Sequence, residues 1–370
     1  MFRTAWTIGR LRGIPLRLHV SLLLVVPLFA AGLTRQIEQV APGPLVLSTA
    51  LFGVLMSIAI FLAIALHELG HGLVARRQGA RVQGITLMIL GGVTEIERRP
   101  STPMQDLQVA AAGPAVNLGL GIVALLLARL VSQPDLFVGL FLFGEINLAL
   151  GLFNLVPAFP MDGGRILKAL FQLRMPEDRA VRIAATIGRT LAMAAMGFGL
   201  IGGHFGLALV GLFVYLGAGA EAEATVARVA IHGHTARQAM ATRVVTVLPS
   251  AHVAGVARHM LMNGAEAALV RDLERTYGVL LVGDLLKVED AAARDLLAER
   301  RPLWVEADDA LEAVVQAMQQ AHQPAIVRDA GNAIIGIVTW EAVERLTQLR
   351  GLVDADRPTE RVMPDNATPR

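Results

Sequence analysis

Long apolar segments dominate the first 222 residues, and they constrain the fold more than any other feature of the chain. A helix needs about 20 mainly apolar residues to cross the hydrocarbon core of a bilayer. Six segments meet this need, at 18–34, 47–69, 108–131, 136–156, 183–202 and 204–221. In total 54% of the residues are hydrophobic, above the roughly 45–50% of soluble domains. The sequence predicts a polytopic α-helical membrane domain over residues 1–222.

The basic residues predict how this domain is oriented. Arginine and lysine gather before the first segment, between the second and third, and between the fourth and fifth, within 3–17, 76–99 and 165–182. The intervening loops hold almost none. Because short cytoplasmic loops carry the excess of Arg and Lys, the sequence predicts a multi-pass protein of the cell membrane with cytoplasmic N- and C-termini.

Charge and cysteine content exclude two classes of site. The formal net charge is only +2, which gives no broad basic surface for nucleic acid. The chain has no cysteine, which excludes disulfides and thiolate ligands. A bound metal must therefore be held by His, Asp or Glu.

Residues 67–71 read His-Glu-Leu-Gly-His, where the second apolar segment ends. On a helix His67 and His71 share one face, so both imidazoles can reach one zinc ion. Glu68 lies beside them, as in the H-E-x-x-H arrangement whose Glu activates water. Ionisable groups at membrane depth are costly and usually carry function. The alternative is an interfacial helix end whose polar residues meet the lipid headgroups.

A catalytic zinc takes three protein ligands and keeps a fourth position open. The best third ligand is Asp162, which follows the fourth apolar segment and lies on the same predicted side as the end of the second. Pro157 and Pro160 block a regular helix there, and Gly163-Gly164 allows a tight turn. The alternative role for Asp162 is to cap the helix that begins near Gly164.

These motifs together resemble the site-2 protease family of intramembrane zinc metalloproteases. The resemblance is carried by HELGH, by Asn154-Leu-Val-Pro and Asp162-Gly-Gly-Arg, and by Ala112-Gly-Pro-x-x-Asn117 between them. The closest branch carries C-terminal CBS domains, and is similar to stage IV sporulation protein FB and archaeal site-2 proteases. Residues 13–19 also resemble that branch. One departure is Met161, where the family usually has Leu.

The resemblance implies a zinc-dependent endopeptidase that cleaves transmembrane segments of membrane proteins, in regulated intramembrane proteolysis. A single Zn²⁺ per chain would be held by His67, His71 and Asp162, and Glu68 would take a proton from zinc-bound water. Asn154 would hold the substrate backbone or assist the oxyanion. The implied partners are a transmembrane substrate, for example a membrane-anchored regulator, and the lipid bilayer, with no nucleic acid.

Residues 80–99 predict two β-strands joined by a turn at Gly91-Gly92. The segment has an alternating residue pattern and is rich in β-branched residues. A strand edge exposed to lipid would leave backbone groups unpaired. The segment should then lie against protein or a cavity, where it would pair with an extended stretch of substrate. A plain cytoplasmic hairpin is the alternative.

The rest of the chain has ordinary soluble composition and contains an internal repeat. Residues 268–272 recur at 325–329 and residues 278–281 recur at 336–339, with helices expected at 251–263 and 308–321. This α/β unit, over 239–350, resembles a pair of CBS motifs, which would lie in the cytosol and support a homodimer. Residues 223–238 are expected to form a linker and 351–370 a disordered tail.

Many CBS pairs bind adenine nucleotides through a hydroxyl and a carboxylate that follow the second strand. The first copy keeps Asp284 but has Leu281 at the hydroxyl position, and the second keeps Thr339 but has Ala342 at the carboxylate position. Because neither copy is complete, a nucleotide site and a purely structural or dimerising module both stay open.

Two other functions compete with the protease. Glu145 and Asn147 lie in an apolar segment and suit the ion path of a CBS-regulated transporter or channel, as well as packing between helices. Nothing in the sequence indicates the inverted repeats and broken helices of such transporters. A catalytically inactive membrane scaffold is the third hypothesis, and retention of Glu68 beside the proposed ligands argues against it.

Overall fold

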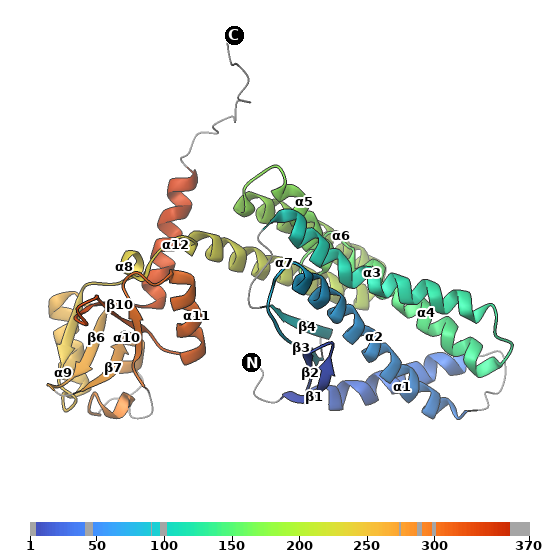
Figure 1. Ribbon diagram of the computed structural model, residues 1–370, viewed down its shortest axis with the longest axis horizontal. Coiled ribbons are helices and arrows are strands. Elements are labelled where there is room, and N and C mark those ends of the chain that lie inside the picture. The colour runs from blue at the N-terminus through green and yellow to red at the C-terminus, as the bar shows by residue number, and fades with distance from the viewer. Residues whose placement is uncertain are drawn as a thin grey trace, which may run out of the picture. The chain divides into compact units, whose positions relative to one another are not determined.

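The computed structural model describes residues 5–40, 47–89, 91–96, 102–273, 275–286, 291–297 and 301–355 (Figure 1). The chain divides into two compact units, Met1–Glu223 and Ala224–Arg370.

The first unit consists mainly of helices that follow the apolar segments. They are α1 (Leu22–Val40), α2 (Thr49–Arg77), α3 (Pro103–Ala128), α4 (Pro134–Asn154), α5 (Asp162–Gln172), α6 (Glu177–Ile201) and α7 (Phe205–Ile231). Among the described residues, five helices are long and apolar enough to cross a membrane: α2, α3, α4, α6 and α7. Helix α3 packs against α2, α4 and α5 (Figure 1), so it lies between the helices that carry the motifs.

Helix α1 corresponds to the first of the six predicted segments but is not among those five. It nevertheless lies along α2. Ser57 Oγ donates to the Val26 carbonyl oxygen (3.2 Å), and Thr34 Oγ1 donates to that of Thr49 (3.4 Å). Gly53 permits this approach, since an added Cβ would lie 2.3 Å from Thr34 Oγ1. Residue numbers rise along α1 as they fall along α2, so the two helices pack antiparallel.

A four-stranded sheet packs against α2. Its strands are β1 (Ala5–Leu11), β2 (Ile14–His19), β3 (Val82–Met88) and β4 (Gly91–Ile96), in the order β1-β2-β3-β4. Strands β2 and β3 are parallel, and the other two pairs are antiparallel. The hairpin predicted within 80–99 is confirmed as β3 and β4. Gly91 and Gly92 begin β4, however, instead of forming the turn.

The sequence did not predict the N-terminal hairpin of β1 and β2. Its turn lies at Arg12 and Gly13, with φ values of 48° and 85°, a left-handed conformation that glycine adopts freely. Ile14 follows the turn and is 1% exposed, in a core shared with Leu69 of α2 and Ile85 of β3. This core holds the sheet against α2 near the HELGH motif.

The second unit repeats one α/β pattern. The first copy comprises β5 (Val244–Val247), α9 (Val253–Asn263), β6 (Ala267–Arg271), β7 (Thr276–Leu281) and α10 (Val282–Leu285). The second comprises β8 (Leu303–Glu306), α11 (Leu311–Ala321), β9 (Ala325–Arg328), β10 (Ile334–Val338) and α12 (Trp340–Ala355). In each copy the first two strands are parallel and the last two antiparallel, so the internal repeat is confirmed.

The two copies share a core, and two predicted boundaries change. Leu269 of β6 packs with Ile326 of β9 in one buried cluster.

The expected linker 223–238 is largely helical, because α7 continues to Ile231 and α8 (Ala236–Ala239) follows. Ile231 is buried in the core of the second unit, which explains why the helix extends that far. Helix α12 continues through the start of the expected tail 351–370, of which 356–370 lie outside the described residues.

Candidate active site and metal centre

His67, Glu68 and His71 lie within α2 and are all buried. Their helix continues to Arg77, so α2 extends beyond the end of the apolar segment 47–69, where the motif lies. The Nε2 atoms of His67 and His71 are 3.1 Å apart. One helical turn separates the two residues, which puts both rings on one face.

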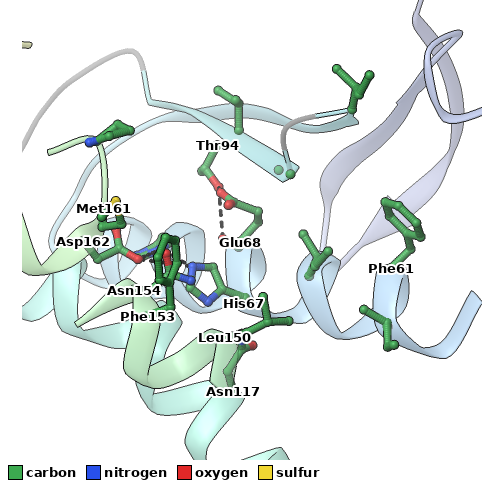
Figure 2. Close-up of a pocket in the computed structure, with 18 of the residues that line it drawn as sticks. Phe61, His67, Glu68, Thr94, Asn117, Leu150, Phe153, Asn154, Met161 and Asp162 are labelled. Carbon is green, nitrogen blue, oxygen red and sulfur yellow. Dashed lines mark hydrogen bonds and ion pairs between the residues drawn. The ribbon is translucent and has the colours of Figure 1, made fainter. Parts of the chain in front are cut away.

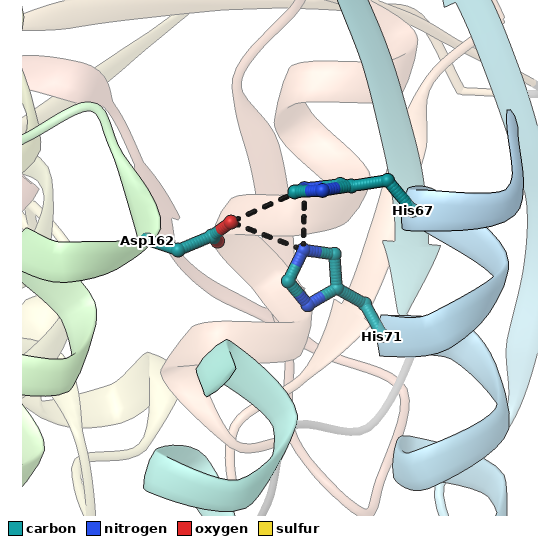
Figure 3. Close-up of side chains that lie close together, drawn as sticks. All are labelled: His67, His71 and Asp162. Atoms are coloured by element: carbon teal, nitrogen blue, oxygen red, sulfur yellow. Dashed lines mark hydrogen bonds and ion pairs between the residues drawn. The ribbon is translucent and has the colours of Figure 1, made fainter. Parts of the chain in front are cut away.

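Asp162 reaches these histidines from α5 (Figure 3). Its Oδ2 lies 3.2 Å from His67 Nε2 and 3.3 Å from His71 Nε2, and the three ligand atoms lie within 4.8 Å of one another. Met161 occupies the N-cap position, and Asp162 is the first residue of the helix. The carboxylate is therefore directed to the histidines, and the helix-capping alternative is wrong.

Two glycines explain why α5 can begin at this point. A Cβ added to Gly163 would lie 2.2 Å from the Val156 carbonyl oxygen, and one added to Gly164 would lie 2.6 Å from the Ala158 carbonyl carbon. The first turn of α5 therefore packs directly on the backbone of the segment before it. This contact turns the Asp162 side chain towards α2.

The donor set fits a zinc ion. Tetrahedral zinc with bonds of roughly 2.0–2.1 Å separates its ligand atoms by about 3.3 Å, close to the distances among His67, His71 and Asp162. Gly113 of α3 leaves room for these groups, because a Cβ there would lie 2.2 Å from His71 Nε2 and 2.5 Å from His67 Nε2. The space for a metal depends on this missing side chain.

A backbone carbonyl orients His71, and the two histidines set the charge of Asp162. His71 Nδ1 donates to the Val109 carbonyl oxygen (2.7 Å), and such a bond leaves Nε2 as the ligand atom. Burial by itself would raise the pKa of the Asp162 carboxyl, but its hydrogen bonds with His67 and His71 hold that pKa well below its ordinary value. Asp162 is thus an anionic donor suited to a divalent cation.

An ion pair ties α5 to α3 beside this centre. Lys168 of α5 is 7% exposed, and its Nζ lies 2.8 Å from Asp106 Oδ2 of α3 and 3.4 Å from Glu177 Oε1 of α6. A buried charge is stable only when it is paired. The pair therefore restrains the helix that carries Asp162 against the helix that carries Gly113.

A cavity of about 800 Å³ opens onto the metal centre (Figure 2). Its polar lining includes Glu68, Thr94, Asn117, Asn154 and Asp162, and its apolar lining includes side chains from α1, α2, α4, β4 and α7. Strand β4, at the edge of the sheet, forms one wall. The hairpin thus lies against protein and a cavity, as the first of the two alternatives predicts.

The structure reveals contacts that sequence reasoning missed. Thr94 Oγ1 lies 2.7 Å from Glu68 Oε2 (Figure 2), and no pattern joins two residues so far apart in the chain. Gly113 belongs to a motif that the sequence singled out, but its role becomes visible only from its distance to the histidines. Asn154, the last residue of α4, reaches the cavity as expected.

The polar residues in the middle of α4 have other surroundings. Asn147 is fully buried, and its Nδ2 donates to the Phe143 carbonyl oxygen (2.8 Å) in its own helix. Glu145 is exposed on the described surface of the chain. Neither belongs to the described lining of the cavity, so the geometry gives them no place beside the metal centre.

Asp284 and Thr339 form helix-capping bonds at equivalent points of the two copies. Asp284 Oδ2 accepts a hydrogen bond from the Leu281 amide, and Thr339 Oγ1 accepts one from the Ala342 amide, both at 3.1 Å. A capping box has two reciprocal bonds, one from the side chain of the first residue to the later amide and one from the later side chain to the first amide. The first copy has the second of these bonds, and the second copy has the first. Each residue therefore has a structural role that requires no nucleotide.

The solved structures that are similar to this chain include CBSX2 and a site-2 protease. The chain is similar to CBSX2, a protein solved in complex with AMP, with 22% identity over 34% of this chain and all of that one, at a TM-score of 0.27. The chain is also similar to the site-2 protease from Methanocaldococcus jannaschii, with 34% identity over 59% of this chain and 95% of that one, at a TM-score of 0.43.

Comparison with families and curated proteins identifies the class of enzyme. The model of peptidase family M50 matches residues 55–137 and 132–195, which include the HELGH motif and Asp162. The putative zinc metalloprotease Rip3 of Mycobacterium tuberculosis is 30% identical over 99% of this chain and 98% of its own length. The resemblance to site-2 proteases is thereby confirmed, and the chain belongs to peptidase family M50 as a multi-pass membrane metalloprotease of the site-2 type.

Proposed function

We propose that this enzyme cleaves transmembrane segments of membrane proteins within the bilayer, with zinc held by His67, His71 and Asp162. One observation carries the proposal: three buried ligand atoms from two helices converge within 4.8 Å beside Glu68. The separation of these atoms fits zinc, and the absent Cβ of Gly113 leaves space for it.

Glu68 is the proposed general base and acid. Zinc at this centre would supply Lewis-acid activation of water and polarisation of the peptide carbonyl. The Glu68 carboxylate takes a proton from the attacking water and passes it to the leaving nitrogen as the peptide bond breaks. Asn154 reaches the same cavity, and its amide is proposed to hold the substrate backbone or the carbonyl oxygen.

Strand β4 is the proposed docking edge for an extended stretch of substrate. A transmembrane helix has its backbone groups paired, so it must unwind locally before its peptide bond becomes accessible. The outer edge of β4 lies at the end of the sheet and along the cavity. Added strands bind such edges through main-chain hydrogen bonds. The apolar wall from α2 and α4 suits the side chains of a membrane-spanning partner.

Both termini are proposed to be cytoplasmic, in a cell membrane. The pairing of β2 with β3 supports this for the N-terminus, because β3 follows the basic end of α2. The antiparallel packing of α1 on α2 supports a sixth crossing. After α2, the four helices α3, α4, α6 and α7 would cross the membrane in turn. An even number of crossings then leaves the C-terminal end of the chain on the side of the membrane where α2 ends.

The repeated unit is proposed to be a cytosolic regulatory and dimerising module. Its doubled strand pattern supports a CBS-type pair. Adenine nucleotide binding by Asp284 and Thr339 stays a prediction, since their capping bonds account for both residues without a ligand.

Replacing Glu68 with Gln separates metal binding from proton transfer. Zinc content should match the wild type, while cleavage of a transmembrane peptide in detergent should fall by about 10²–10⁴-fold, the usual contribution of a general base. Zinc per purified chain is measured by mass spectrometry and cleavage by product analysis. Wild-type activity in this variant, or a wild type without zinc, would contradict the proposed function.

Replacing Asp162 with Asn tests the third ligand. The amide lacks the negative charge, so zinc affinity should fall by at least about 100-fold, the upper range for losing a supporting group. Asp135→Asn is the matched control, because Asp135 is also buried but accepts a hydrogen bond from the Leu47 amide away from the centre. Equal zinc affinity in the two variants would remove Asp162 from the ligand set.

Replacing Gly113 with Ala tests the space at the metal. The added Cβ would lie 2.2 Å from His71 Nε2, so zinc content and cleavage should both be lost. Gly119→Ala on the same helix adds a Cβ with nothing within 4 Å and should bind zinc as the wild type does. Wild-type zinc content in both variants would show that the metal does not bind beside Gly113.

Replacing Val93 with Pro tests substrate pairing on β4. Proline has no N–H to donate, and one lost hydrogen bond of about 1 kcal/mol lowers kcat/KM by about fivefold. Zinc content should not change. Val93→Ala keeps the N–H and is the control. If the two variants cleave the peptide equally well, the edge of β4 does not bind substrate.

A further inference from the structure

Strand β4 packs on the face of α2 that carries the proposed base. Glu68 and Gly72 lie one turn apart on this face. A Cβ added to Gly92 of β4 would lie 2.3 Å from Glu68 Cγ, and one added to Gly72 would lie 3.6 Å from Thr94 Cγ2. Gly92 is the glycine that this close approach requires, since a side chain there would overlap Glu68, whereas the distance from Gly72 is an ordinary van der Waals contact. The Glu68 side chain therefore lies directly against β4.

Thr94 makes the polar part of this contact. Its Oγ1 lies 2.7 Å from Glu68 Oε2 and 3.1 Å from the Glu68 carbonyl oxygen (Figure 2). A hydroxyl has one proton to donate, and the shorter contact is with the carboxylate, where a charge-assisted bond is the stronger one. Threonine is also stiff at χ1. The hydroxyl is therefore presented to Glu68 from a fixed direction.

We propose that Thr94 is a positioning residue for the catalytic carboxylate. Its hydroxyl holds Glu68 Oε2 and so fixes the plane of the carboxylate that takes and returns the proton. A free glutamate side chain samples many rotamers, and ordering it has an entropic cost. The bond to β4 removes much of this cost before substrate arrives. The inference rests on the proposed role of Glu68.

The position of Thr94 gives the hairpin a second task. The same strand that lines the cavity and offers an edge to substrate also holds the base. Displacement of β4 would therefore move the Thr94 hydroxyl away from Glu68. Efficient proton transfer then depends on β4 staying packed against α2.

Removal of the hydroxyl tests this role. Thr94→Val keeps the branched shape, and its kcat should fall by about 10–100-fold, as for other groups that orient a metal-site residue. KM should stay within about twofold, and zinc content should equal that of the wild type. Thr94→Ser keeps the hydroxyl and should retain most of the wild-type kcat. The full-length enzyme is assayed in detergent on a transmembrane peptide.

A matched substitution in the same sheet is the control. Thr86 of β3 is buried, with its Oγ1 3.5 Å from Glu95 Oε1 and not beside Glu68, so Thr86→Val should leave kcat unchanged. A wild-type kcat in Thr94→Val, or equal losses in the Val and Ser variants at position 94, would overturn the inference. If Thr94→Val is fully active while Glu68→Gln is inactive, the positioning role fails and the proposed function stands.

Discussion

The contact of Asp162 with His67 and His71 is the interaction on which the rest of the first unit depends. Burying polar and charged groups is costly unless they are paired or hold a metal, and all three side chains are buried. Their pairing joins α2 to α5, two helices separated in the chain by residues 78–161. Glycines at 113, 163 and 164 lie where a side chain would prevent that approach.

The sheet extends this arrangement to the base. The N-terminal hairpin pairs with β3, and its Ile14 fills a core against α2. This anchoring keeps β4 beside Glu68, where Gly92 gives room and Thr94 gives a hydrogen bond. A buried ionisable residue thus obtains its partners from a strand as well as from helices, and the same strand forms a wall of the cavity.

Much of the fold could be predicted from the sequence where a local pattern carries the information. Apolar length predicted the helices, and alternation around Gly91-Gly92 predicted β3 and β4. The internal repeat predicted two similar α/β copies. Prediction failed at 223–238, where the polar stretch continues α7 because Ile231 is buried in the second unit. It also failed to find β1 and β2, whose pairing with β3 depends on contacts distant in sequence.

The sequence by itself determined the chemistry of the centre: two histidines one turn apart, a glutamate beside them, and no thiolate to compete for metal. The helical repeat suffices for that conclusion, because it places residues i and i+4 on one face. Only the tertiary structure decided that Asp162 faces those histidines, that Gly113 leaves them space and that Thr94 reaches Glu68. Those contacts join segments far apart in the chain, and only the packing of helices and sheet in three dimensions brings them together.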